Sequence, residues 1–139
     1  MKKKGKSYWK AKTWKEFSRY IRLRDCIKTT NFKDSGKCIT CNKVYPFKQL
    51  QAGHFIPGRN HQVLFDEEQV NAQCYHCNVG LKGNWPAYLK VMVQRHGQDK
   101  VDIMLNEHMF PKIYEIEDYE QLYKLYKDRA NELELGINL

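Results

Sequence analysis

The sequence lacks any long apolar run. No stretch approaches the roughly 18 consecutive apolar residues that a membrane-spanning helix requires, so we expect no membrane partner. The basic start, Met1-Lys2-Lys3-Lys4, is not followed by an apolar segment, so it does not have the form of a secretory signal. We therefore expect a cytosolic protein, or one that works in the host cytoplasm if a virus encodes it.

The sequence also lacks internal repeats and low-complexity linkers, which excludes solenoid and largely disordered chains. Its 139 residues, 42% hydrophobic and 29% charged, are typical of one globular domain with room for helical extensions. Residues 36–85 carry glycines and cysteines but few periodic apolar runs. That region predicts a loop-rich core that needs help from a bound metal.

Acidic residues are scarce in the first third of the chain. Residues 1–48 hold fifteen Lys and Arg against three Asp and Glu, a net charge of +12. Residues 49–139 hold nine and thirteen, a net charge of −4. A polyanionic partner would meet the N-terminal third first, although a solvated basic tail would have the same composition.

Two helical regions and a strand-bearing middle follow from the apolar spacing. Thr13 and Glu16 form a candidate capping box at the start of the first helix, and residues 1–12 are expected to be mobile. Asn84 is a candidate N-cap before Pro86. The predicted elements are a helix over 13–24, strands over 50–55 and 63–65, and helices over 84–96, 99–109 and 116–133. The last helix carries an apolar stripe that fits either a core or a partner contact: Tyr119, Leu122, Tyr123, Tyr126 and Leu133.

Four of the five cysteines form two C-x-x-C pairs separated by 32 residues. Cys38 and Cys41 make the first pair, and Cys74 and Cys77 make the second. In a cytosolic protein such pairs indicate zinc ligands before disulfides or a redox pair, because two turns of this kind supply four thiolates to a tetrahedral ion. We predict a structural zinc site, with Cys26 as a small buried apolar residue.

A candidate catalytic set lies between and just after the two pairs. Asn71 lies 17 residues after His54, and Asn78 follows seven residues later, directly after Cys77. Phosphodiester hydrolysis needs a deprotonated water near neutral pH, which suits a histidine base, and a divalent cation on the scissile phosphate. An asparagine amide oxygen is a hard ligand suited to Mg²⁺. Asn71 would hold the hairpin or the His54 ring by hydrogen bonds.

This order of His, Asn and a third ligand-capable residue, framed by two C-x-x-C pairs, resembles the HNH motif of ββα-metal nucleases. Asn directly after the last zinc cysteine is similar to phage endonuclease VII type resolvases. The flanks resemble the phage NinG family, also called Rap recombinases. The matching segments are residues 14–25, 52–56, 64–67, 71–74 and the Gly83-Asn84 step.

The resemblance implies an α+β fold: a small zinc-stapled ββα-metal core with an N-terminal helix and C-terminal helices. We divide the chain into a basic arm and helix (1–35), a zinc-bound nuclease core (36–96) and a helical extension (97–139). The implied activity is endonucleolytic cutting of branched DNA, such as Holliday junctions and D-loops, leaving 5′-phosphate and 3′-hydroxyl ends. His54 and Asn78 would carry the catalytic Mg²⁺ or Mn²⁺, and the DNA contacts would be Arg19, Arg22, Arg59 and Lys82.

One position departs from the HNH pattern. Many members carry Asp or His before the catalytic histidine as a second metal ligand, and here that position is Gly53. Gln51, His61, Asp66 or water would have to complete the ligand set. A non-catalytic zinc module that binds nucleic acid, and an adaptor for a partner recombinase, are the alternatives. A resolvase cuts two strands in symmetry, so a homodimer is also expected.

Overall fold

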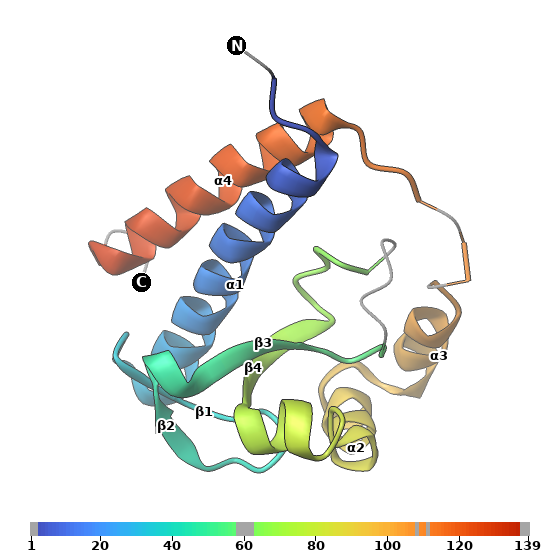
Figure 1. The fold of residues 1–139 in the computed structure, drawn as a ribbon. Coiled ribbons are helices and arrows are strands. Elements are labelled where there is room, and N and C mark those ends of the chain that lie inside the picture. Colours follow the sequence, from blue (N-terminus) through green and yellow to red (C-terminus); the bar gives the residue numbers. More distant parts are fainter. Residues whose placement is uncertain (1–2, 58–62, 108, 111, 137–139) are drawn as a thin grey trace.

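The computed structural model describes residues 3–57, 63–107, 109–110 and 112–136, and its elements are mixed α and β (Figure 1). Two antiparallel hairpins lie at the centre, one of β1 with β2 and one of β3 with β4. Helices α1 and α4 lie side by side on one side of the second hairpin, and α2 and α3 lie on the other (Figure 1). The strands are Ser35–Lys37 (β1), Val44–Pro46 (β2), Leu50–His54 (β3) and Val70–Cys74 (β4), and the helices are Lys6–Thr30 (α1), Trp85–His96 (α2), Gln98–Glu107 (α3) and Ile116–Glu134 (α4).

Helix α1 extends well beyond the predicted 13–24. The predicted capping box is wrong: Thr13 lies inside the helix, buried, and its hydroxyl donates a 2.8 Å hydrogen bond to the carbonyl of Tyr119. Residues 6–12 are helical, so the expected mobile arm is wrong for that part. The helix extends because Trp9 packs edge-on against Tyr123 of α4, with 5.9 Å between ring centroids. Capping residues are local sequence signals, so they do not predict a helix extension that depends on a tertiary contact.

The β3–β4 hairpin is the element that carries the candidate chemistry. Its register pairs Gly53 with Asn71 and His54 with Val70. The predicted strand over 50–55 is confirmed, but the strand predicted over 63–65 is wrong. Residues 63–65 form buried turns, in which Asp66 N bonds Val63 O at 3.2 Å. A short apolar run does not distinguish a buried turn from a strand.

The three C-terminal helices largely follow the prediction. Helix α2 ends at His96 and α4 begins at Ile116 as expected, whereas α3 ends at Glu107, before Met109. Asn84 is the N-cap residue and Pro86 lies in the first turn as predicted, but the backbone of Asn84 is left-handed (φ 47°) and its side chain makes no capping bond. Helix α4 has the capping box that α1 lacks, formed by Glu115 and Asp118.

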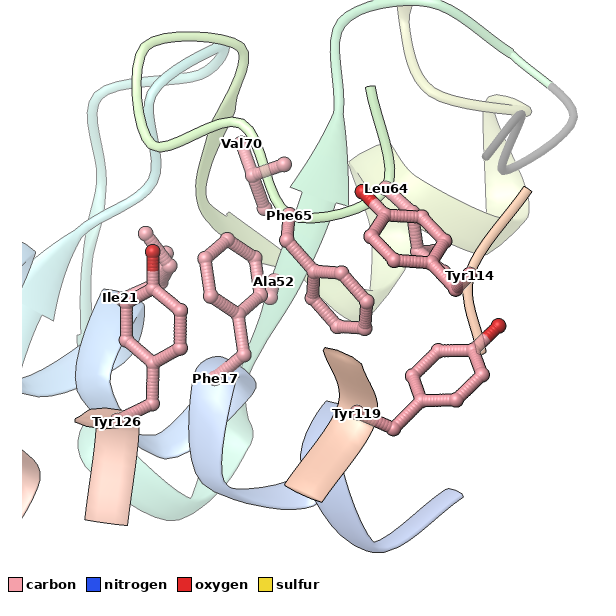
Figure 2. Packing of buried hydrophobic residues seen from close by; sticks show 9 residues of the cluster. All are labelled: Phe17, Ile21, Ala52, Leu64, Phe65, Val70, Tyr114, Tyr119 and Tyr126. Atoms are coloured by element: carbon pink, nitrogen blue, oxygen red, sulfur yellow. The ribbon is translucent and has the colours of Figure 1, made fainter. Parts of the chain in front are cut away.

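One aromatic core joins both ends of the chain to the hairpin (Figure 2). Phe17 of α1 is fully buried and packs edge-on against Tyr126 of α4, with ring centroids 4.8 Å apart. Figure 2 shows the residues of this core cluster: Phe17, Ile21, Ala52, Leu64, Phe65, Val70, Tyr114, Tyr119 and Tyr126. Much of the apolar stripe of α4 is therefore used within the chain, against α1. The division of the chain into three segments stays a prediction.

Helix α1 is fixed to the hairpin by one buried carboxylate. Asp25 is 7% exposed and accepts a 2.7 Å hydrogen bond from the backbone N–H of Ala72. Arg24 pairs with it at 2.8 Å and also donates to the carbonyl of Val70. A buried carboxylate needs such partners, so these bonds fix how α1 crosses β4. Among the described residues, no helix is both long and apolar enough to span a bilayer.

Candidate functional site: a cysteine cluster and a histidine cleft

The four cysteines of the two C-x-x-C pairs gather at one point. Their sulfur atoms all lie within 4.8 Å of one another, and Cys41 Sγ lies 3.9 Å from Cys74 Sγ. Zinc–sulfur bonds of about 2.3 Å place the sulfurs of a tetrahedron roughly 3.8 Å apart. The donor set therefore fits a zinc ion, and the predicted gathering of these four residues is confirmed. Three of the cysteines are buried; Cys26, also buried, lies outside the cluster as expected.

Neighbouring groups donate hydrogen bonds to the cluster sulfurs. The backbone N–H of Cys77 points at Cys74 Sγ over 3.4 Å, and Asn84 Nδ2 lies 3.7 Å from Cys77 Sγ. Burial raises the pKa of the Cys77 thiol to about 12. A thiol in this setting loses its proton when a cation is present to neutralise the sulfur, which is what zinc supplies.

A cleft of about 550 Å³ lies between α1, β3 and the turn that follows β4. Four predicted site residues meet there. The lining includes the candidate catalytic and DNA-contacting residues His54, Asn78, Arg22 and Lys82, together with Trp14, Ser18 and Gln51. Helix α1 contributes Trp14, Ser18 and Arg22 at intervals of four, which is the spacing of one helical face.

His54 ends β3, and two contacts orient its half-buried ring. The ring stacks on Trp14, with centroids 5.1 Å apart and planes 16° apart. Nε2 lies 3.2 Å from the carbonyl oxygen of Leu64. A carbonyl only accepts, so Nε2 carries the proton and the lone pair of the neutral ring resides on Nδ1. That is the tautomer a general base uses, with the second nitrogen fixed by a hydrogen bond.

Asn78 and Gln51 form a polar pair at the cleft. Asn78 lies in the π-helical turn His76–Gly80, and its Nδ2 donates a 2.8 Å hydrogen bond to Gln51 Oε1 on β3. Because the nitrogen makes this bond, Oδ1 of Asn78 is the atom suited to a cation.

Two cations line the same cleft. Arg22 stacks over the ring of Phe47 at 4.5 Å and donates to Ser18, and burial lowers the pKa of its guanidinium. Lys82 is exposed and has a left-handed backbone (φ 51°). Gly83 and Asn84 share that conformation, with φ of 94° and 47°, so three successive residues turn the chain sharply from the π-helical turn into α2.

Asn71 lies away from the cleft and acts through a buried hydrogen-bond chain. It is 2% exposed, and its Nδ2 donates to Tyr88 Oη at 3.1 Å. Tyr88 in turn donates to the carbonyl of Gly53 at 2.7 Å, one residue before His54. Arg95 and Arg24 donate to Asn71 Oδ1 at 3.0 and 3.2 Å. Tyr88 thus links β4 to β3, and this link was not predicted because nothing in the local sequence connects a tyrosine of α2 to β3.

Gly53 has no room for a side chain. A Cβ built there would lie 2.0 Å from Gln73 Oε1 and 3.1 Å from Gln73 Cβ. Gln73 is fully buried, and its Nε2 is bonded to Thr40 and to the carbonyl of Gly83. Position 53 therefore cannot hold the acidic or histidine ligand that many HNH proteins have before the catalytic histidine without displacing this bonded side chain.

The remaining predicted residues lie elsewhere. Arg19 donates to Glu16 and to Asn131, so it bridges α1 to α4 and is not among the residues lining the cleft. Asp66 accepts from Glu68 N and from Gln69 Nε2 within its own turn. Arg59 and His61 lie outside the described residues.

Comparison with known proteins agrees with the resemblance. The family model described as Bacteriophage Lambda NinG protein matches residues 1–135. The chain belongs to the NinG family. Among curated proteins, it is 28% identical to protein ninG of Escherichia phage lambda over 131 residues, which cover 94% of this chain and 59% of that protein. Protein ninG of Salmonella phage P22 is 30% identical over 106 residues, covering 76% and 48%.

The NinG match spans both the cysteine cluster and the histidine cleft, so the predicted family resemblance is confirmed. The chain spans about 60% of the length of relatives such as protein ninG of Escherichia phage 933W, to which it is 28% identical. No solved structure matches the chain. Catalysis, DNA contacts and a catalytic cation therefore remain predictions for this NinG-family chain.

Proposed function

We propose that this chain is a metal-dependent DNA endonuclease of phage recombination, with His54 as the general base. The observation that carries the proposal is the setting of His54 in the cleft. Its Nε2 lies 3.2 Å from a carbonyl oxygen and its ring stacks on Trp14, so the lone pair of the neutral ring is on Nδ1, the atom that would take a proton from water. The reaction is attack of that water on a phosphodiester, with the proton passing to His54.

The polar residues of the cleft supply the other requirements of phosphodiester hydrolysis. Asn78 and Gln51 bring amide oxygens to the cleft, and both are suitable ligands for Mg²⁺ or Mn²⁺. Such an ion, when bound, would neutralise charge on the scissile phosphate and the leaving oxygen. His54 cannot hold the ion through the same lone pair that accepts the proton, so the base role excludes simultaneous ligation at Nδ1.

The local architecture supports an HNH assignment. The β3–β4 hairpin runs directly into the helical turn His76–Gly80, which carries Asn78, in the order strand, strand, helix. This short helical segment contains Cys77, and Asn78 directly follows that last cysteine of the cluster, as in endonuclease VII type resolvases by the resemblance noted above. A zinc ion bound by the four cysteines would then hold the first C-x-x-C turn against the end of β4 in the proposed catalytic hairpin.

The charges of the cleft support DNA as the substrate. Arg22 and Lys82 would contact backbone phosphates, and the positive N-terminal third would attract the polyanion. Branched DNA as the preferred form follows from the family resemblance, as does action in the host cytoplasm. A homodimer and a partner recombinase belong to the same proposal.

One observation favours a second function, a non-catalytic nucleic-acid-binding module. No Asp or Glu is found among the described residues that line the cleft. A cation held only by neutral amides and water is bound more weakly than one held by a carboxylate. A pure binding module would nevertheless gain nothing from the oriented tautomer of His54.

The test is incubation of the purified protein with a labelled four-way junction, a duplex and a single strand of matched length. If the chain is the proposed endonuclease, it should cut DNA only with Mg²⁺ or Mn²⁺ and should stop in EDTA. The products should carry 5′-phosphate and 3′-hydroxyl ends. The ranking of the three substrates distinguishes a resolvase from a general endonuclease. Tight binding without cutting in either metal would instead identify the binding module.

A further inference from the structure

A second hollow lies at the opposite edge of the β3–β4 hairpin from the histidine cleft. The cleft takes its strand lining from β3, whereas the second hollow, of about 350 Å³, takes Asn71 from β4. We call this hollow the β4-edge pocket. Its walls are the C-terminal end of α1, the first C-x-x-C turn and the face of α2 that carries Arg95.

Three separate elements each bring a cation to the β4-edge pocket. Lys28 comes from α1, Lys37 from β1 and Arg95 from α2. Asp25 is the one acidic residue in the described lining, and its carboxylate is already paired with Arg24 and bonded to the N–H of Ala72. In the described part of the chain, neither Lys28 nor Lys37 forms an ion pair. The pocket therefore carries uncompensated positive charge.

The charges in the pocket repel one another. Partial burial lowers the pKa of the Lys28 ammonium and the positive charge of Arg95 lowers it further, while the Asp25 carboxylate offsets only part of this effect. An anion placed between the two groups would relieve this repulsion. Keeping the positive charges of Lys28 and Arg95 close together costs free energy, and a bound polyanion would offset that cost.

The neutral lining of the pocket also suits an anion with several oxygens. Thr40, Asn42 and Gln94 add hydroxyl and amide groups that can donate hydrogen bonds beside the cations. Phosphate oxygens of a nucleic-acid backbone are bound by this mixture of Lys, Arg, Thr, Asn and Gln. A metal ion would require oxygen or thiolate ligands without cations, so the pocket does not suit one.

We propose that the β4-edge pocket is a second phosphate-binding site, which holds the backbone of a second duplex arm while the first arm lies in the histidine cleft. The proposal rests on the proposed function of that cleft as a DNA site. The hairpin separates the two hollows, so phosphates bound in each come from different segments of the nucleic acid. A branched molecule offers two such segments, and a linear duplex of short length does not.

Variants of Lys28 and Lys37 provide the cleanest test. Both side chains lie outside the hydrogen-bond chain that leads to Gly53, whereas Arg95 donates to Asn71 and its removal would also disturb the hairpin. The double variant K28Q/K37Q removes two positive charges. K124Q/K127Q removes the same number from exposed positions of α4, which contributes no residue to the described lining of either hollow, and is the matched control.

Binding is measured in EDTA, so the result does not depend on whether the protein cuts DNA. The probes are a four-way junction and a 12-base-pair duplex, titrated over a range of salt concentrations. Each phosphate contact contributes about 0.9 to the slope of log K against log salt, so K28Q/K37Q should lower the junction slope by about 1.8. The ratio of junction affinity to duplex affinity should also fall in K28Q/K37Q. The control K124Q/K127Q should keep the wild-type slope and the wild-type affinity ratio.

An unchanged slope in K28Q/K37Q, or a change equal to that of the control, would overturn the second site. A wild-type protein that binds junction and short duplex equally would also overturn it. Far-ultraviolet circular dichroism and zinc content establish that each variant is folded, and single variants should each give half of the slope change. Failure of the proposed nuclease function would appear separately, as absence of cutting when Mg²⁺ is restored.

Discussion

Gly53 and His54 are neighbours on β3 with opposite requirements. At position 54 a large ring contacts Trp14 and the carbonyl of Leu64. At position 53 no side chain fits, because Gln73 occupies the space beside the backbone. The sequence revealed that Gly53 departs from the HNH pattern. It could not reveal the reason, since Gln73 lies 20 residues away and meets Gly53 only through the pairing of β3 with β4.

Gly53→Ala should destabilise the protein by about 1–3 kcal/mol, because the added Cβ overpacks a site occupied by a buried, bonded glutamine. The measurement is chemical denaturation of the variant beside wild type. Gly5→Ala is the matched control, since a Cβ at Gly5 meets nothing within 4 Å. A stability of Gly53→Ala equal to that of the control would contradict the account of this position.

Asn78→Ala should raise the Mg²⁺ concentration needed for half-maximal cutting, because the variant removes an amide oxygen proposed as a ligand. The same substitution also breaks the 2.8 Å bond to Gln51 Oε1. Gln51 is itself a candidate ligand, so the control leaves Gln51 in place: Asn78→Asp removes the Nδ2 donor of this bond while keeping a ligand oxygen at position 78. An unchanged Mg²⁺ requirement in Asn78→Ala would exclude the ligand role.

At the scale of single residues, the composition of the cleft was largely predictable and its internal contacts were not. His54, Asn78, Arg22 and Lys82 were chosen from spacing and charge, and all four line one cleft. Arg19 was chosen for the same reason, but its side chain turns to α4, where it bonds Asn131. A polar residue on a helix can extend toward one or the other of two neighbouring parts of the fold. For Arg19 these are the cleft and α4, and only tertiary packing decides between them.

Among the elements, helix α2 contacts the β3–β4 hairpin that carries His54 and joins its two strands through hydrogen bonds. Tyr88 of α2 is fully buried and links Asn71 on β4 to the carbonyl of Gly53 on β3. The chain of hydrogen bonds ends one residue from His54. It therefore joins both strands of the hairpin next to His54, and Tyr88 would position the histidine in this way.

Tyr88→Phe should cost about 1–3 kcal/mol, because two buried polar groups lose their partner. The cutting rate at saturating DNA should fall, with little change in the affinity for DNA, since the cleft itself keeps its lining. Tyr123→Phe, on the half-buried side of α4, is the matched control. A variant that loses stability but cuts at the wild-type rate would show that the chain has only a structural role.

The cysteine cluster should behave as a folding site. Cys77→Ser should abolish stoichiometric zinc binding and unfold the loop-rich middle of the chain, because a structural zinc site contributes directly to folding free energy. Zinc content and the thermal transition give the readout. Cys26→Ser, outside the cluster, should retain full zinc content, and loss of zinc in that variant would contradict the assignment of ligands.

The long periodic elements were predictable and the short irregular ones were not. Helices α2 and α4 follow from apolar spacing, whereas α1 extends seven residues before Thr13 through contacts of Trp9 with α4. The turns of 63–65 were mistaken for a strand because their side chains are apolar and buried. The π-helical turn that carries Asn78 has too few residues to leave a periodic signal.

For the whole molecule, the two ends of the chain combine to hold the hairpin. Helices α1 and α4 share the aromatic core over one side of β3 and β4, and α2 with α3 form a second core on the other side. The histidine cleft and the β4-edge pocket lie at the two edges that remain. The arrangement places one candidate catalytic site and one candidate phosphate site on a single small scaffold.

The most direct test of the account is the single-turnover rate at which a four-way junction is cut in Mg²⁺ by wild type, His54→Ala and His76→Ala. His76 is exposed on the turn after β4 and is the matched control. We predict that His54→Ala cuts at least about 10²-fold more slowly, with DNA affinity and zinc content retained, and that His76→Ala cuts at the wild-type rate. Cutting by His54→Ala at the wild-type rate would contradict the role of His54 as the base.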